Sequence, residues 1–219
     1  MGIHGGKAGM GREKTPYISI SSSAVRGRAM VPNQQVRLTV RDYLDIPEDD
    51  ENRYQLIDGE LYMAPAPSYE HQESSLNLAA ILRDFVRENG LGRVVASPID
   101  VYLSDGDVVQ PDIVFISNER LHIIHSDGLH GAPGLVIELL SPGTERIDRT
   151  LKRERYEKFG VGEYWLADPI AKTIVVFRAR TVAFERIGVF TEGMALETPL
   201  LPGLRVEISA VFDYYVPSR

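Results

Sequence analysis

The sequence predicts an α/β fold in which helices flank a mixed central β-sheet. Residues 68–167 read in order as a helix, four short strands, a second helix and a further strand. Helices interspersed with strands in this way pack as layers on the faces of a sheet. The spacing of apolar residues supports this reading, because it is helical in the first segment and forms short continuous runs in the later ones. An N-terminal hairpin and C-terminal strands are added to this core.

Three segments carry helix signals. In the long helix that begins after Ser68, apolar residues return every three or four positions, and Gly90 marks the end. A short helix follows Thr39, with Asp42 three residues later as its capping partner. A further helix is predicted over residues 145–159, ended by Gly160. The apolar stripe of the long helix comprises Leu78, Ile81, Leu82, Phe85 and Val86.

The strands are short apolar runs bounded by turn residues. Asp58-Gly59 lies between residues 53–57 and 61–63, and this dipeptide is a strong hairpin signal. Residues 49–52 before it form a polar turn, and residues 105–107 form a second turn. The remaining strands are predicted over residues 93–97, 100–103, 112–117, 135–140, 164–167, 173–177, 182–187 and 204–207.

Residues 1–30 differ in composition from the rest of the chain. They are rich in glycine, serine and basic residues and show no apolar period. We interpret them as a disordered leader or an extended translation start, with Met30 as the native start. A basic arm that contacts DNA is the alternative. Residues 31–219 are predicted to form a single domain, a length that one hydrophobic core can serve.

Composition narrows the function classes. The net charge is −7, and because residues 1–30 contribute +4, the remainder carries −11. Such an acidic body argues against a protein that coats DNA, since phosphate neutralisation needs Lys and Arg. The absence of cysteine excludes disulfides and thiolate metal sites and fits a reducing, cytoplasmic location. No apolar run is long enough to span a bilayer, and no secretory leader opens the chain.

Two acids lie where burial should be costly. Asp112 opens the apolar strand 112–117, and Glu138 lies inside the apolar strand 135–140. A carboxylate in such a strand needs a partner or a metal ion. Two acids on neighbouring strands can converge on one hard cation such as Mg²⁺. The alternative is that each acid pairs with an arginine at a strand end.

Lys152 is the candidate basic partner. It lies four residues after Asp148 on the helix 145–159, and Tyr156 and Phe159 continue the same stripe. If these aromatic residues face inward, Lys152 points toward the sheet. A lysine near a metal-bound water can orient that water or stabilise the transition state. The alternative is an ordinary surface pair between Asp148 and Lys152.

Other candidates are weaker. Glu60 follows the hairpin turn, and Glu70 and His71 open the long helix, where an acid often serves the helix dipole. His122, His125 and His130 are spaced by three and five residues in a polar loop without cysteine, a pattern that does not favour a zinc site. The sequence contains no phosphate-binding glycine loop, nucleophile elbow or dinucleotide-binding fingerprint.

In this order along the chain, the residues resemble the Uma2 family of endonucleases. The resemblance covers roughly residues 37–212 and rests on the ordered set rather than on any one piece. The matching segments are Arg53-Tyr54-Gln55-Leu56-Ile57-Asp58-Gly59-Glu60-Leu61, His71, Gln110-Pro111-Asp112, Val136-Ile137-Glu138-Leu139-Leu140-Ser141-Pro142, Asp148, Lys152, Tyr156 and Gly160-Val161-Gly162-Glu163-Tyr164-Trp165-Leu166-Ala167-Asp168-Pro169.

The resemblance implies a restriction endonuclease-like fold of the PD-(D/E)XK superfamily. Asp112 would be the motif aspartate and Glu138 the second acidic metal ligand. The lysine that the pattern expects two residues after this acid is absent, and Leu140 stands there. Lys152 looks like a migrated replacement from the adjacent helix. Glu60 or Glu70 would complete the metal shell.

The leading functional prediction is a Mg²⁺- or Mn²⁺-dependent endonuclease that hydrolyses DNA phosphodiesters. In it, Asp112 and Glu138 bind the metal and Lys152 is catalytic, with Glu60, Glu70, His71, Asp148 and Tyr156 as accessory candidates. The alternative is a weak or inactive nuclease-fold protein that binds nucleic acid or a protein partner. A purely structural protein that dimerises through residues 173–187 or its C-terminal segment is a third reading. A homodimer is expected in any case, because two-fold pairing would present two sites to two strands.

Overall fold

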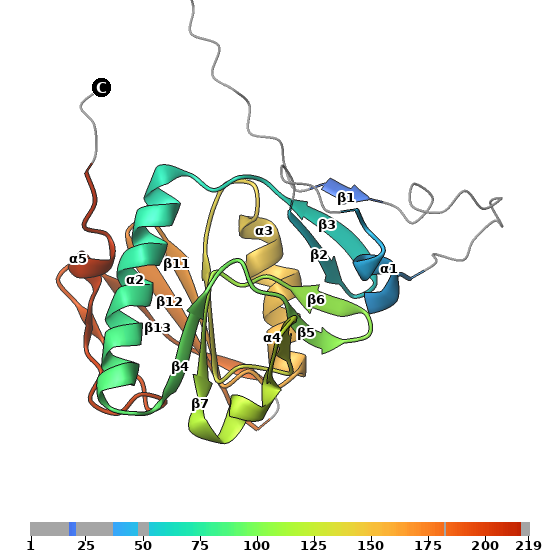
Figure 1. Cartoon of the computed structure of the whole chain (residues 1–219). Helices are drawn as coiled ribbons and strands as arrows, with labels where there is room; N and C mark the ends of the chain where they lie inside the picture. Colours follow the sequence, from blue (N-terminus) through green and yellow to red (C-terminus); the bar gives the residue numbers. More distant parts are fainter. Residues whose placement is uncertain (1–17, 21–36, 48–52, 182, 216–219) are drawn as a thin grey trace, which may run out of the picture.

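The computed structural model describes residues 18–20, 37–47, 53–181 and 183–215 (Figure 1). The polar turn predicted at residues 49–52 and most of the predicted leader lie outside these ranges. Within the leader, Ile18–Ile20 form strand β1, which pairs antiparallel with strand β3 (Glu60–Ala64). The prediction of disorder is therefore wrong for these three residues, because they add a strand to the edge of the N-terminal hairpin.

The strands form two large sheets where the sequence suggested one. The order is β13-β12-β11-β10-β7-β4 in the six-stranded sheet and β1-β3-β2-β6-β5-β9-β8 in the seven-stranded sheet. The predicted strand 100–103 belongs to the second sheet, so its placement in the central sheet was wrong. It pairs with β6, a three-residue strand after the turn at Asp105-Gly106 that the sequence did not predict.

The six-stranded sheet contains β4 (Gly92–Ala96), β7 (Ile113–Ser117), β10 (Leu135–Leu139), β11 (Glu163–Asp168), β12 (Thr173–Ala179) and β13 (Phe184–Thr191). The seven-stranded sheet adds to β1 and β3 the strands β2 (Arg53–Ile57), β5 (Val101–Ser104), β6 (Asp107–Val109), β8 (Ile124–His125) and β9 (Gly128–His130). A small third sheet pairs β14 (Ala195–Leu196) with β15 (Val206–Glu207), which is all that remains of the predicted edge strand 204–207.

The predicted helix caps are confirmed. In α1 (Val40–Leu44), Thr39 and Asp42 form a reciprocal capping box. Ser68 caps α2 (Tyr69–Glu88) by accepting a hydrogen bond from the His71 amide, and Gly90 follows the helix with a φ of 62°. The short helices η2 (Asn118–Ile123) and α5 (Ile208–Val211) were not predicted.

The predicted helix 145–159 is present but irregular. It consists of α3 (Glu145–Ile147), a π-helical segment η3 (Asp148–Lys152) and α4 (Arg153–Lys158). Single π-helical turns inside an α-helix occur often at functional sites. This one holds both Asp148 and Lys152.

Two apolar cores lie on the two faces of the six-stranded sheet. On one face, α2 and α5 pack through residues such as Leu78, Leu82 and Val211 against Ile137 and Trp165 of the sheet. On the other face, the helix 145–158 and the seven-stranded sheet cover a second core (Figure 1). Its members include Ile57, Val101, Val114, Val136, Tyr156 and Tyr164.

The register of β7 against β10 positions the two predicted acids. Ile113 pairs with Ile137 in this antiparallel ladder. Continuing the same register places Asp112 opposite Glu138. Because side chains alternate along a strand, both acids share the face of Val114 and Val136, against which the helix 145–158 packs.

The same helix connects β10 to its parallel neighbour β11. In this pair of strands, Glu138 of β10 lies opposite Leu166 of β11. A helical crossover is the usual link between parallel strands. No helix in the described ranges is long and apolar enough to cross a membrane.

The packing of α2 yields a first prediction. Leu78→Ala removes a fully buried side chain of the first core, so it should lower the free energy of unfolding by about 2–5 kcal/mol. Leu76→Ala, on the exposed side of the same helix with 66% of Leu76 accessible, should change it by no more than about 0.5 kcal/mol. Urea denaturation of the two variants would measure this contrast, and equal losses would contradict the assigned packing.

Candidate active site

The predicted acids and lysine line one polar pocket beside the carboxyl end of β10. The pocket has a volume of about 60 Å³, room for an ion and a few water molecules. Its charged and titratable lining residues are Arg53, His71, Asp112, Glu138, Asp148 and Lys152. They come from β2, α2, the start of β7, β10 and η3, so the pocket exists only after both sheets and two helices have assembled.

Asp112 is held at the entrance to β7 by its neighbours. One carboxylate oxygen, Oδ2, accepts a hydrogen bond of 2.7 Å from the Leu139 amide. The same oxygen lies 3.4 Å from His71 Nε2. Burial lowers the pKa of His71, but the hydrogen bond and charge of Asp112 outweigh burial, and the pKa ends above its ordinary value. Asp112 is therefore anchored by a strand amide and a helix histidine, and not by an arginine.

Glu138 is almost completely buried, with 2% of its surface exposed. Its Oε1 accepts hydrogen bonds from Lys152 Nζ at 3.0 Å and from the Tyr156 hydroxyl at 2.6 Å. Burial nevertheless raises the pKa of Glu138 to about 8, because the lowering effect of Lys152 is offset by the charges of Asp148 and Asp112. The pocket thus gathers three carboxyl groups around one buried lysine, Lys152.

Lys152 joins two of the acids. Its Nζ also lies 3.2 Å from Asp148 Oδ1, and both side chains are buried. The alternative of a surface pair between these residues is therefore wrong. The contact is close but not aligned as a hydrogen bond, and Asp148 Oδ1 has no hydrogen-bond partner among the described residues. Burial raises the pKa of Asp148 above its ordinary value, against the lowering effect of Lys152.

Of the accessory candidates, the structure brings some to the pocket and leaves others outside. His71 lines the pocket, and the Tyr156 hydroxyl donates a hydrogen bond to Glu138. Neither Glu60 nor Glu70 is among the described residues that line it. Glu60 is exposed and accepts a hydrogen bond of 2.9 Å from the Tyr62 hydroxyl. Glu70 is half-buried in the first turn of α2 and affects the pKa of Tyr214 instead.

Several polar residues at the pocket were not singled out from the sequence. Gln55 Oε1 accepts a hydrogen bond of 2.9 Å from the backbone N–H of Gln110. The side-chain oxygen of Gln110, Oε1, is buried with no hydrogen-bond partner among the described residues. Both glutamines belong to segments that carry the family resemblance, so the signal was present but unspecific. Ser141 and Thr144, in the turn after β10, also line the pocket.

The donor set suits a hard divalent cation. Asp112, Glu138, Asp148 and Gln110 line the same space, and the amide oxygen of Gln110 has no hydrogen-bond partner among the described residues. Mg²⁺ and Mn²⁺ prefer oxygen ligands of this kind. A metal ion would favour the ionised form of these acids.

The raised pKa of Glu138 leads to a stability prediction. The unfolded chain releases this proton near pH 4.5 and the folded chain near pH 8, so ionisation of Glu138 lowers stability progressively across that interval. Gln cannot ionise. Glu138→Gln should therefore leave the metal-free protein as stable at pH 8 as the parent, or more stable, in urea denaturation with EDTA.

Glu163 provides the matched control for this measurement. It is equally buried, but its carboxylate is paired with Arg178 at 2.5 Å and with the Trp165 indole at 2.9 Å. Glu163→Gln breaks a satisfied buried pair and should cost about 3–5 kcal/mol. A comparable loss for Glu138→Gln would show that Glu138 is an ordinary structural acid.

Comparison with solved structures finds a chain of similar fold. It is similar to a structure from Anabaena variabilis ATCC 29413 titled as "a putative nuclease belonging to DUF820", with 23% identity and a TM-score of 0.68. The match covers 80% of this chain and 97% of that chain. At this identity the likeness establishes a shared fold.

Among curated proteins, none matches the chain. The family model Uma2, described as "Putative restriction endonuclease", matches residues 40–209. This span is well over half of the chain and includes every residue of the pocket, and the chain therefore belongs to the Uma2 family.

Proposed function

We propose that this protein is a metal-dependent endonuclease that hydrolyses DNA phosphodiester bonds, with Asp112 and Glu138 holding Mg²⁺ or Mn²⁺. One observation carries the proposal: Asp112, Glu138 and Asp148 line the same pocket around one buried lysine, Lys152. The description of the family as restriction endonucleases and the nuclease named in the similar structure support it.

A divalent ion bound there would supply an activated water and offset the charge that develops on the scissile phosphate. The protein's part is to keep its ligands in place. Asp112 is oriented by the Leu139 amide and His71, and Glu138 by Lys152 and the Tyr156 hydroxyl. Each acid thus has one oxygen engaged by the protein, which fixes the carboxylate plane.

Lys152 would position the attacking water. Its ammonium group is held by Glu138 and Asp148 at 3.0 and 3.2 Å. A fixed donor of this kind stabilises negative charge in the transition state without reorganisation. The long side chain delivers the amine from η3 to the strand end, where the PD-(D/E)XK pattern places a lysine on the strand itself.

Arg53 would contact the DNA backbone at the rim. It is exposed, and it lines the pocket from β2. An arginine can hold a neighbouring phosphate by two hydrogen bonds, which would set the position of the scissile group. This placement explains how a chain with a net charge of −7 could still bind a polyanion.

The proposal includes a homodimer. One protomer presents one Asp112–Glu138 pocket, and breaking both strands of a duplex in one encounter needs two such pockets related by a two-fold axis. Cleavage products distinguish the cases, because a dimer makes double-strand breaks where a monomer accumulates nicks.

Cleavage of supercoiled plasmid is the direct test. With Mg²⁺ or Mn²⁺ the parent protein should convert the plasmid, and Asp112→Asn should slow conversion by at least about 100-fold. Glu70→Gln is the control, since Glu70 does not line the pocket, and it should retain the parent rate. Absence of cleavage by the parent on single- and double-stranded substrates with both metals would replace the proposal with a binding role on the same fold.

Metal binding should also depend on pH. Because burial raises the pKa of Glu138 to about 8, the ion must displace a proton below that pH. The affinity for Mg²⁺ should therefore rise between pH 6 and 8, with proton release measurable by calorimetry in buffers of different ionisation enthalpy. Glu138→Gln should bind weakly without this proton release. Equal affinity at both pH values would exclude Glu138 as a ligand.

A further inference from the structure

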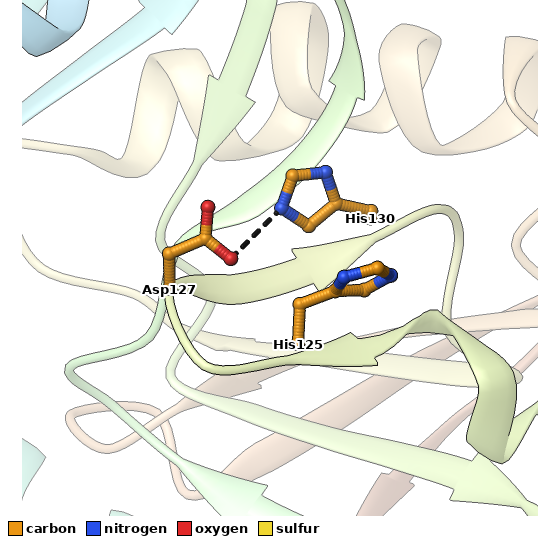
Figure 2. Close-up of side chains that lie close together, drawn as sticks. All are labelled: His125, Asp127 and His130. Carbon is orange, nitrogen blue, oxygen red and sulfur yellow. Dashed lines mark hydrogen bonds and ion pairs between the residues drawn. The ribbon is translucent and has the colours of Figure 1, made fainter.

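A second group of potential ligands lies in the hairpin formed by β8 and β9. His125, Asp127 and His130 each offer one ligand atom, and these atoms lie within 4.8 Å of one another. Figure 2 shows the three side chains gathered on the same side of the hairpin. None of them lines the Asp112–Glu138 pocket, and all three are exposed.

Direct contacts hold this group together. His130 Nε2 lies 3.0 Å from Asp127 Oδ1 (Figure 2). The imidazole rings of His125 and His130 are 4.5 Å apart between centroids and tilted by 50°. On its other side, His130 stacks on Tyr102 at 4.6 Å with an interplanar angle of 22°. The aromatic support limits the freedom of the His130 ring.

The backbone beneath the group is built into the seven-stranded sheet. His125 pairs with Gly128 within the hairpin, and His130 pairs with Tyr102 of β5. At Gly128 φ is 145°, and a Cβ atom there would lie 2.5 Å from the Asp100 carbonyl oxygen. Only glycine fits this approach, so the turn that carries Asp127 is held directly against β5.

We propose that His125, Asp127 and His130 form a binding site for a transition-metal ion such as Zn²⁺. Two imidazole nitrogens and one carboxylate oxygen suit Zn²⁺, Ni²⁺ or Co²⁺, whereas Mg²⁺ requires oxygen ligands. The ion takes the place of the proton shared by His130 Nε2 and Asp127. Three protein ligands leave a fourth position for water, the arrangement of an open zinc site.

The surroundings leave room for that fourth ligand. A cavity of about 330 Å³ adjoins the hairpin and is lined by His125, Asp127, Asp100 and Gln110 among others. Gln110 also lines the Asp112–Glu138 pocket. The proposed site is thus separate in its ligands from the nuclease pocket but shares one wall with it, and it does not depend on the proposed nuclease function.

Calorimetric titration with Zn²⁺ tests the site. The full chain carrying Asp112→Asn and Glu138→Gln serves as background, because these changes remove the two acids proposed to hold the ion of the other pocket. One equivalent of Zn²⁺ should bind. His125→Asn, His130→Asn and Asp127→Asn should each weaken binding by at least about tenfold, since even outer-shell changes cost 10–100-fold.

His122 supplies the matched control. It is an exposed histidine three residues before His125, and its Nδ1 contacts the Glu119 carbonyl oxygen at 3.1 Å. His122→Asn should bind Zn²⁺ as the background does. Asp127→Asn keeps both imidazole rings and their contact with each other. Weaker Zn²⁺ binding by this variant would therefore reflect the loss of a ligand and not the loss of the hairpin structure.

The same proteins titrated with Co²⁺ give a second readout, because coordination by imidazole at a four-ligand site produces strong visible absorption. No Zn²⁺ binding by the background at millimolar concentration would overturn the proposal. So would equal binding by His122→Asn and the three hairpin variants. Either result would leave the hairpin residues as an aromatic stack alone.

Discussion

The buried contact of Glu138 with Lys152 and Tyr156 connects the sheet to the crossover helix, and the candidate active site depends on it. Lys152 and Tyr156 reach Glu138 from two successive turns of the helix 145–158. That helix in turn fixes the parallel pairing of β10 with β11. The contact therefore sets both the depth of the pocket and the position of the helix over the second core.

This arrangement is electrostatically costly in the absence of a cation. The pKa values of Glu138 and Asp148 are raised by burial, so the protein favours protonated acids where ionised ones would bind metal. The apolar cores on both faces of the sheet compensate for this cost. By contrast, Glu163 is equally buried but satisfied by Arg178 and Trp165, which shows that the fold can accommodate a buried acid without leaving it short of partners.

The residues of the pocket differ in how well the sequence predicts them. Asp112, Glu138 and Lys152 stand out because a charge in an apolar strand, or on an inward helix stripe, is a local anomaly, and the structure brings all three together. The sequence did not show whether Glu60 and Glu70 reach the pocket, since the direction of their side chains depends on how the hairpin and α2 pack on the sheet.

The grouping of His125 with Asp127 and His130 was missed because it arises from a tight turn against β5, which spacing alone does not reveal. The division into two sheets was missed for a similar reason, because three-residue strands carry little signal.

The π-helical segment makes the candidate site sensitive to chain length. Such a turn contains one residue more than an α-helix would use. Deleting one residue between Asp148 and Lys152 would restore a regular helix and leave its flanking parts nearly in their present register. Tyr156 could still reach Glu138, but the spacing of Asp148 and Lys152 along the pocket wall would change. The way in which these two side chains meet in the pocket is thus encoded by an irregularity of the helix.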